Sequence, residues 1–295
     1  MLLSDIIKAR IDWLKGGYNH MVNALEILSP KLDLIFKLLF GTEGSIEILT
    51  DFLLSVLKLS PSEYDKLTIA NPFLLQEYKG GKLGILDVKL TLKSGKVINI
   101  EIQVDPAPAM TSRIVFYTSK LVTSQMSEGD SYDKIQRVIS IIITDHPLIE
   151  ESDKFHHHFG LHDLESKVLL TDILEIHTLE IPKARKYFDD TEDTTLLNWM
   201  KFLDAKTEEE LNVLAQKSPV MQKATLRLLE LSADEKARQL YEARLKEQSD
   251  YNTRERGAII KIAKNFLSMG MSINDVSTGT GLSYEDVERL QNADL

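Results

Sequence analysis

Two segments, LDVKLTLK from Leu86 and KVINIEIQVD from Lys96, constrain the fold of this chain most. Apolar and polar residues alternate along both of them, and successive side chains of a β-strand point to opposite faces of its sheet. Glu101 and Gln103 therefore share one face of the second strand. Because only Ser94 and Gly95 separate the two segments, we predict an antiparallel hairpin with a tight turn.

The length of this turn decides the register of the hairpin. A two-residue loop at Ser94 and Gly95 would put Asp87 and Glu101 on opposite faces and would mix apolar with polar residues on both. A three-residue loop that begins at Lys93, with Gly95 in the left-handed conformation, pairs Asp87 directly with Glu101. We predict this second register, because it separates the apolar residues (Leu86, Val88, Leu90, Ile98, Ile100 and Ile102) from the polar ones (Asp87, Lys89, Asn99, Glu101 and Gln103).

The predicted pairing of Asp87 with Glu101 indicates a metal site. Two carboxylates whose Cβ atoms lie roughly 5 Å apart repel each other unless a proton or a cation lies between them. Hard oxygen ligands suit Mg²⁺ or Mn²⁺, and such an ion can polarise a phosphoryl oxygen and activate a bound water. Gln103 could position that water. The alternative is a half-exposed strand face that carries acids without a metal.

The rest of the chain predicts further helices and strands before and after this hairpin in the sequence. Two helices joined by a turn at Gly41 to Gly44 precede the strands, and a further strand is predicted at residues 66–72. A helix at 111–126 and a buried strand at 137–145 follow. A loop rich in histidine then leads to a second β-like stretch from Asp172. From about Asp190 the pattern is helical to the end.

The C-terminal residues 257–295 resemble a small helix-turn-helix unit. One helix is predicted to end at Gly270, Ser272 to cap the next, and Ser283 with Asp286 to cap the last. The last helix is acidic, whereas a DNA-recognition helix is usually basic. The alternation of Lys, Arg and Glu over residues 222–256 is typical of a solvated helical face.

Composition excludes several classes of protein. The chain has 295 residues, no cysteine and a net charge of -10. This charge argues against a protein that coats nucleic acid, but a nuclease needs positive charge only in its substrate groove. No apolar run approaches the roughly 20 residues of a membrane span, and the first 20 residues lack the apolar core of a signal peptide. We expect a cytoplasmic protein without a small-molecule cofactor.

The ordered series of segments resembles the PD-(D/E)XK nuclease superfamily, and within it the Rpn (recombination-promoting nuclease) family of transposase-like proteins. LDLIFKLLFG is similar to the opening helix, LDVKL and NIEIQ to the two active-site strands, and SRIVFYTSKL to the helix that follows. The later segments HTLEIPK and GMSINDVSTGTGLSYEDVERL also resemble that family. The resemblance implies an α/β restriction-endonuclease-like core, a mixed central sheet flanked by helices, with an α-helical C-terminal region.

The resemblance also assigns roles to individual residues. It implies that Asp87 and Glu101 bind the metal and that Gln103 stands where many relatives hold a lysine. Asp33 resembles the acidic residue of the first helix and could reach the metal through water, or it could simply complement the helix dipole after Pro30. Lys37, on the same helical face, could supply positive charge.

Two further groups of residues have open interpretations. Arg113 and Tyr117 share a helical face and could contact a phosphate, although packing on the sheet is the favoured role of Tyr117. Neighbouring histidines on an extended segment point to opposite sides, so the group at 156–162 is interpreted as packing residues rather than as a metal site: His156, His157, His158 and His162.

The sequence therefore predicts a DNA endonuclease that uses Mg²⁺ or Mn²⁺, with a capacity to form homo-oligomers. The alternative is a catalytically inactive nuclease fold that binds DNA or protein through its helical tail. The predicted domains are an extension at 1–20, a nuclease-like core at 21–190, a helical region at 191–256 and the unit at 257–295. The resemblance begins near Met21, so the biological start is expected there.

Overall fold

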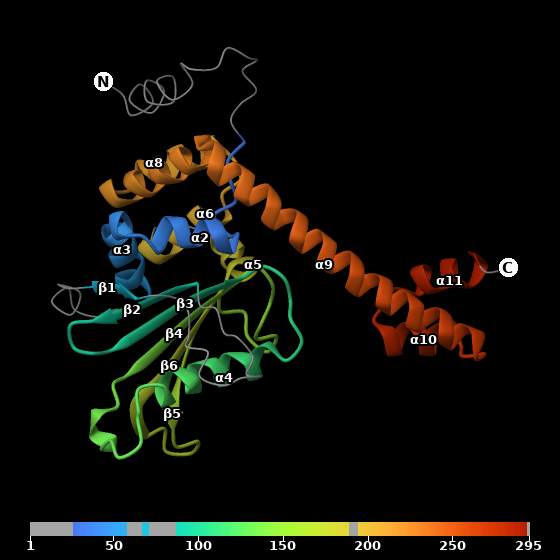
Figure 1. The fold of residues 1–295 in the computed structure, drawn as a ribbon, viewed down its shortest axis with the longest axis horizontal. Helices are drawn as coiled ribbons and strands as arrows, with labels where there is room; N and C mark the ends of the chain where they lie inside the picture. Colours follow the sequence, from blue (N-terminus) through green and yellow to red (C-terminus); the bar gives the residue numbers. More distant parts are fainter. Residues whose placement is uncertain (1–25, 58–66, 71–86, 189–193, 294–295) are drawn as a thin grey trace, which may run out of the picture. The chain divides into compact units, whose positions relative to one another are not determined.

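The computed structural model describes residues 26–57, 67–70, 87–188 and 194–293 (Figure 1). The predicted extension at 1–20 and the predicted start at Met21 lie outside these residues. The chain forms two compact units, Met1–Arg238 and Gln239–Leu295. The boundary between them falls in the long helix α9 (Glu235–Ser268), as does the boundary predicted at residues 256 and 257.

The first unit is built on a six-stranded mixed sheet in the order β1-β2-β3-β4-β6-β5. Strands β1, β2 and β3 are antiparallel, β3, β4 and β6 are parallel, and β5 returns antiparallel to β6. The strands are β1 (Leu67–Ala70), β2 (Val88–Leu92), β3 (Val97–Gln103), β4 (Val138–Thr144), β5 (His156–His162) and β6 (Leu169–Glu180). The predicted architecture, a mixed sheet flanked by helices with a helical C-terminal region, is confirmed.

The register predicted for the hairpin is also found. Val88 pairs with Ile100 and Leu90 with Ile98. The turn closes through a hydrogen bond of 2.9 Å from the Leu92 N–H to the Lys96 carbonyl, which leaves a three-residue loop. Gly95 has a φ of 87°, in the left-handed region that glycine adopts without steric cost. The apolar residues of both strands are buried as a result.

Helices cover both faces of the sheet (Figure 1). Helix α4 (Met110–Thr123) packs on β4 and β6, where Met110 and Ile114 contact Ile142 and Ile176. The other face is covered by α2 (Asp33–Phe40) and α3 (Ile46–Leu57), with α6 (Thr195–Asp204) behind them. Helices α2 and α3 are the two that the sequence predicted before the strands. The short 3-10 segments are η1 (Glu43–Ser45), η3 (Tyr132–Lys134) and η4 (Arg185–Tyr187).

Aromatic side chains form the core between these helices. Trp199 of α6 is fully buried and its ring lies 5.7 Å from that of Phe40 and 5.9 Å from that of Phe52. The indole N–H of Trp199 donates a hydrogen bond of 2.8 Å to Asp51, so its one polar atom is also satisfied. The apolar faces of α2, α3 and α6 thus pack against one another. This packing holds α2 beside the sheet.

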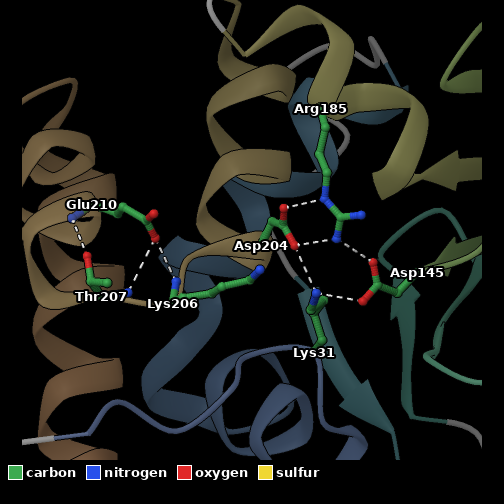
Figure 2. Close-up of polar contacts among 7 residues, drawn as sticks. All are labelled: Lys31, Asp145, Arg185, Asp204, Lys206, Thr207 and Glu210. Carbon is green, nitrogen blue, oxygen red and sulfur yellow. Dashed lines mark hydrogen bonds and ion pairs between the residues drawn. The ribbon is translucent and has the colours of Figure 1, made fainter.

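A network of four charged side chains ties the start of α2 to the end of β4 and the end of α6 (Figure 2). Lys31 Nζ lies 2.6 Å from a carboxylate oxygen of Asp145 and 2.8 Å from one of Asp204. Arg185 contacts the same two carboxylates, at 2.8 Å from Asp145 and 2.6 Å from Asp204. Two cations and two anions alternate, so each charge has two opposite neighbours.

One element differs from the sequence interpretation. The histidine-rich segment, expected to be a loop, is the edge strand β5, which pairs along its length with β6. Its sequence lacks the apolar alternation and the β-branched residues that mark a strand. Hydrogen bonds to the neighbouring β6 provide the order that local preference does not.

Further helices complete the first unit and lead into α9. They are α5 (Ile181–Ala184), α7 (Glu208–Ala215), with a Thr207 and Glu210 capping box, and α8 (Pro219–Ala233). Figure 2 shows this capping box. No helix among the described residues is both long and apolar enough to cross a membrane.

The second unit contains the rest of α9 with α10 (Ile273–Thr280) and α11 (Tyr284–Ala293). Its small core is made by Ala263, Val276 and Val287, one from each helix. The predicted caps are present: Ser272 accepts from the Asp275 N–H at 3.2 Å and Ser283 from the Asp286 N–H at 3.1 Å. The three-helix arrangement expected from the sequence is therefore found.

Candidate functional site

Asp87 lies directly before β2, one position beyond the last paired residue, Val88. The side chain is buried, and one carboxylate oxygen accepts a hydrogen bond of 2.8 Å from the Ile102 N–H of the neighbouring strand. The other oxygen lies 3.2 Å from Lys37 Nζ. Asp87 thus comes one residue before the Val88–Ile100 pair, and its hydrogen bond to Ile102 holds it beside the strand that carries Glu101.

Glu101 lies on β3, on the face of the sheet that α4 covers. Its carboxylate accepts a hydrogen bond of 2.8 Å from the Asn99 side-chain amide, two positions earlier on the same strand. Burial raises the pKa of Glu101 above its usual value, and the neighbouring charge of Asp87 adds to this effect. Arg113 on α4 and Lys37 on α2 act in the opposite direction.

The pKa of Asp87 is raised as well, and burial is again the largest cause. The hydrogen bond from Ile102 and the charge of Lys37 oppose that increase, whereas the charge of Asp33 adds to it. Two neighbouring carboxylates therefore both resist ionisation in the protein alone. A divalent cation would remove this resistance, because it favours the charged form of both.

The structure brings two of the predicted helix residues near this pair. Lys37 contacts Asp87 directly, and Asp33, one turn earlier, acts on it electrostatically. An oxygen of Asp33 also accepts a hydrogen bond of 2.8 Å from the Leu34 N–H, in the first turn of α2. Both interpretations of Asp33, as a metal-linked acid and as a partner of the helix dipole, are compatible with this position.

Gln103 is on the same face as Glu101, since the two are separated by one residue on β3. The side chain of Gln103 is half-buried. Its backbone carbonyl accepts a hydrogen bond of 3.0 Å from the Asp145 N–H. Among the described residues, no hydrogen bond joins the Gln103 side chain to Asp87 or to Glu101. Gln103 is thus close to Glu101 in sequence and shares its face of β3, and its role in positioning water stays a prediction.

Two residues near the carboxylates, Asn99 and Lys89, had no specific role in the sequence prediction, and a third, Arg113, was a candidate for a phosphate contact. The amide oxygen of Asn99 is buried and has no hydrogen-bond partner within the described part of the chain. Lys89 is half-buried, and burial lowers its pKa. Arg113 is exposed on α4, where its charge acts on Glu101. Strand alternation had placed Asn99 and Lys89 on this face, but only the packing of α4 brings Arg113 to it.

These groups fit a divalent cation with oxygen ligands. Asp87 and Glu101 offer carboxylate oxygens, and the unpartnered Asn99 oxygen offers a further acceptor beside them. Mg²⁺ and Mn²⁺ prefer such donors. Tyr117 is half-buried, and its ring centroid lies 5.3 Å from that of Phe116 on the same helix, a contact that leaves its packing on the sheet a prediction.

Comparison with known proteins gives one family match. The family model described as "PD-(D/E)XK nuclease family transposase" matches residues 30–258, most of the chain and all of the candidate site. The match agrees with the resemblance found in the sequence. No curated protein and no solved structure matches the chain.

Proposed function

Because this chain belongs to the PD-(D/E)XK nuclease family transposases, we propose that it is a metal-dependent endonuclease that hydrolyses phosphodiester bonds of DNA. The observation that carries the proposal is the pair Asp87, buried directly before β2, and Glu101, half-buried on the adjacent strand β3, since the pKa values of both are raised. Such a pair is costly in the protein alone and becomes favourable when a cation binds.

In this proposal Asp87 and Glu101 hold Mg²⁺ or Mn²⁺. The Ile102 N–H and Lys37 orient Asp87, and the Asn99 amide orients Glu101. A bound ion would polarise a phosphoryl oxygen and lower the pKa of a water molecule. The protein contributes fixed carboxylates and their supporting hydrogen bonds, so that little rearrangement is needed when the ion binds.

The positive side chains around the pair fit a phosphate group. Lys37 and Arg113 come from helices on opposite faces of the sheet, and Lys89 lies on the same strand face as Glu101. We assign to Lys37 the stabilisation of negative charge that a lysine at position 103 provides in many relatives. Gln103 is assigned the positioning of water, and Asp33 a contact with the ion through water.

The proposal places the enzyme in the cytoplasm, with DNA as its substrate and the C-terminal unit as a contact for DNA, for a second copy or for another protein. The alternative is a nuclease fold that binds without cutting. For this alternative, the acidic character of α11 favours a protein partner over DNA as the ligand of the helical tail. A measurement of DNA cleavage distinguishes the proposed endonuclease from a protein that only binds.

Metal-dependent nicking of supercoiled plasmid tests the proposed activity. The wild-type protein should nick with Mg²⁺ or Mn²⁺ and should stop when EDTA removes the ion. Asp87→Asn and Glu101→Gln should each lower the rate by about a hundredfold or more, because a metal contributes several kcal/mol to this chemistry. Glu128→Gln, at an exposed acid after α4, is the matched control and should keep the wild-type rate.

Two outcomes would contradict the assignment. If the two site variants nick as fast as the wild type while folded, the active site lies elsewhere. If no protein nicks DNA but the wild type retards it in a gel, the binding function replaces the catalytic one.

A further inference from the structure

A second group of ligand atoms converges on strands β5 and β6. The Nε2 atoms of His158 and His177 both lie 2.8 Å from the same oxygen, Oε1 of Glu175. The three ligand atoms are all within 4.8 Å of one another. Two imidazoles and a carboxylate that point at one place form the donor set of many transition-metal sites.

This group lies on the opposite face of the sheet from Asp87 and Glu101. Glu101 pairs with Ile142 and Ile142 with Thr178, so these three share the α4 face. His177 is the neighbour of Thr178 along β6 and therefore points to the other face. His158 pairs directly with His177 and joins it there. The two groups are therefore separate sites.

Supporting contacts orient all three side chains. The other ring nitrogen of His177, Nδ1, lies 2.9 Å from His156 Nε2. Arg137 forms an ion pair with the second oxygen of Glu175, which leaves Oε1 directed at the histidines. The rings of His158 and His177 stack with centroids 4.3 Å apart. Partners of this kind, behind the ligands, fix ring orientation in natural metal sites.

We propose that His158, Glu175 and His177 bind one divalent transition-metal ion, with Zn²⁺ as the expected occupant. Imidazole nitrogen suits Zn²⁺, Cu²⁺ and Ni²⁺, whereas Mg²⁺ prefers oxygen ligands. Zinc bound at 2.0–2.1 Å to each donor separates tetrahedral ligand atoms by roughly 3.3 Å. The present contacts of 2.8 Å would lengthen by a small amount, which side-chain rotation can supply.

The hydrogen-bond network can accept the ion without losing a proton. Each Nε2 that binds metal must present a lone pair, so the proton of each ring moves to Nδ1. The Nδ1 proton of His177 then points at His156 Nε2, which accepts it when His156 carries its own proton on Nδ1. The second oxygen of Glu175 keeps its ion pair with Arg137.

The site joins an edge strand to the body of the sheet. His158 comes from β5, whereas Glu175 and His177 come from β6. The His158 side chain is 57% exposed, while those of Glu175 and His177 are 7% and 4% exposed. The fourth ligand position would therefore open to solvent and take water. Bound zinc should hold β5 against β6 and stabilise the folded protein.

Calorimetric titration of the full chain, without a histidine tag and after treatment with EDTA, tests this proposal. The wild type should bind one Zn²⁺, and an excess of Mg²⁺ should not compete for it. His158→Ala should weaken zinc binding by at least about tenfold, because it removes a ligand at an exposed position that the fold does not need. His162→Ala, an exposed histidine of the same strand, should bind zinc as the wild type does.

Three results would overturn the proposal: absence of zinc binding by the folded wild type, wild-type affinity in His158→Ala, and loss of the zinc in Asp87→Asn. The last would place the ion in the proposed nuclease site. Binding is measured without DNA, so the result does not depend on endonuclease activity. In addition, Co²⁺ bound to the wild type should give the absorption of a nitrogen-ligated ion, and His158→Ala should lose it.

Discussion

At the scale of single residues, the main feature is the cost of holding Asp87 and Glu101 together. Burial raises the pKa of both carboxylates, the charge of Asp87 adds to the increase at Glu101, and the charge of Asp33 adds to the increase at Asp87. Lys37, the Ile102 N–H and Asn99 reduce this cost but do not remove it, since the pKa of each acid stays above its usual value. Arrangements of this kind are found at functional sites more often than in structural ones.

This cost predicts that removing either charge stabilises the metal-free protein. Asp87→Asn and Glu101→Gln should each increase the free energy of unfolding in EDTA at pH 7 to 8. The pKa of each acid is higher in the folded than in the unfolded chain, so the penalty grows as pH rises through the unfolded value and is complete above the folded value. Urea unfolding at several pH values measures the effect.

The same experiment contains its own control. The advantage of the variants should shrink as the pH falls below about 4, where the wild-type acids become protonated in the unfolded chain as well as in the folded protein. It should also reverse when Mg²⁺ or Mn²⁺ is added, because only the wild type gains the bound ion. Variants that are less stable than the wild type in EDTA at neutral pH would show that the carboxylates are not a costly pair.

At the scale of elements, the turn of the β2–β3 hairpin sets which face carries the acids. Gly95 has a positive φ, and a Cβ at this position would lie 3.0 Å from the side chain of Gln136. Gly129 has almost the same φ, but a Cβ there meets nothing within 4 Å among the described residues. An alanine at either position would be strained by the positive φ, but only an alanine at position 95 would also contact a neighbouring side chain.

We expect Gly95→Ala to lower the free energy of unfolding by about 1–2 kcal/mol from the left-handed backbone, with a further loss from the contact with Gln136. Gly129→Ala should show the backbone loss alone. Gly44→Ala, with neither feature, should be close to neutral. Thermal or urea unfolding compares the three. Equal losses for Gly95→Ala and Gly129→Ala would mean that the Gln136 side chain moves away at no cost.

The four-charge network joins α2, β4 and α6 and gives a second prediction at this scale. Asp204 is largely buried; burial raises its pKa, but hydrogen bonds from Arg185 and Lys31 outweigh this and lower it overall. Asp204→Asn should therefore destabilise the protein by about 2 kcal/mol at neutral pH. The loss should fade as pH falls through the lowered pKa of Asp204, where the wild type also loses the charge.

An exposed ion pair provides the comparison for this variant. Lys186 and Asp153 also lie 2.6 Å apart, but both side chains are mostly exposed. Asp153→Asn should change the free energy of unfolding much less than Asp204→Asn does, because water and salt screen such pairs. If the two variants had equal effects, the network of Figure 2 would contribute no more than an ordinary surface pair.

At the scale of the whole molecule, every residue of both proposed sites belongs to the first unit, Met1–Arg238. The second unit has its own small core and its own helix caps. The proposed catalysis and zinc binding thus belong to the first unit, and the proposed contacts with partners belong to the second. The family match spans all of the first unit from residue 30 and enters α9.

This division predicts the behaviour of a chain shortened to residues 1–238. The fragment should fold and should nick plasmid with Mg²⁺ at a rate close to that of the full chain, because its site is complete. Its affinity for DNA, or its oligomeric state, should change, since the second unit is absent. Nicking assays, gel retardation and light scattering measure the three properties. A folded fragment that cannot nick would show that the second unit contributes to the active site.

The sequence alone determined the features that depend on neighbouring residues. Alternation of apolar and polar side chains, together with a glycine able to adopt positive φ, was sufficient to predict the hairpin register, which pairs Val88 with Ile100. Helices α2, α3 and α4 and the caps Ser272 and Ser283 were predicted for the same reason. These features could be predicted because the patterns that specify them, apolar periodicity and capping residues, lie within a few consecutive turns of a helix or positions of a strand.

Only the tertiary structure decided the features that join distant parts of the chain. The pairing of β5 with β6 turned an expected loop into a strand and brought His158 to Glu175 and His177. Packing of α4 brought Arg113 near Glu101, and the position of α2 brought Lys37 to Asp87. These contacts depend on how helices and strands pack together. The residues next to a side chain in the sequence do not identify its partner in a distant element, so local patterns could not predict these contacts.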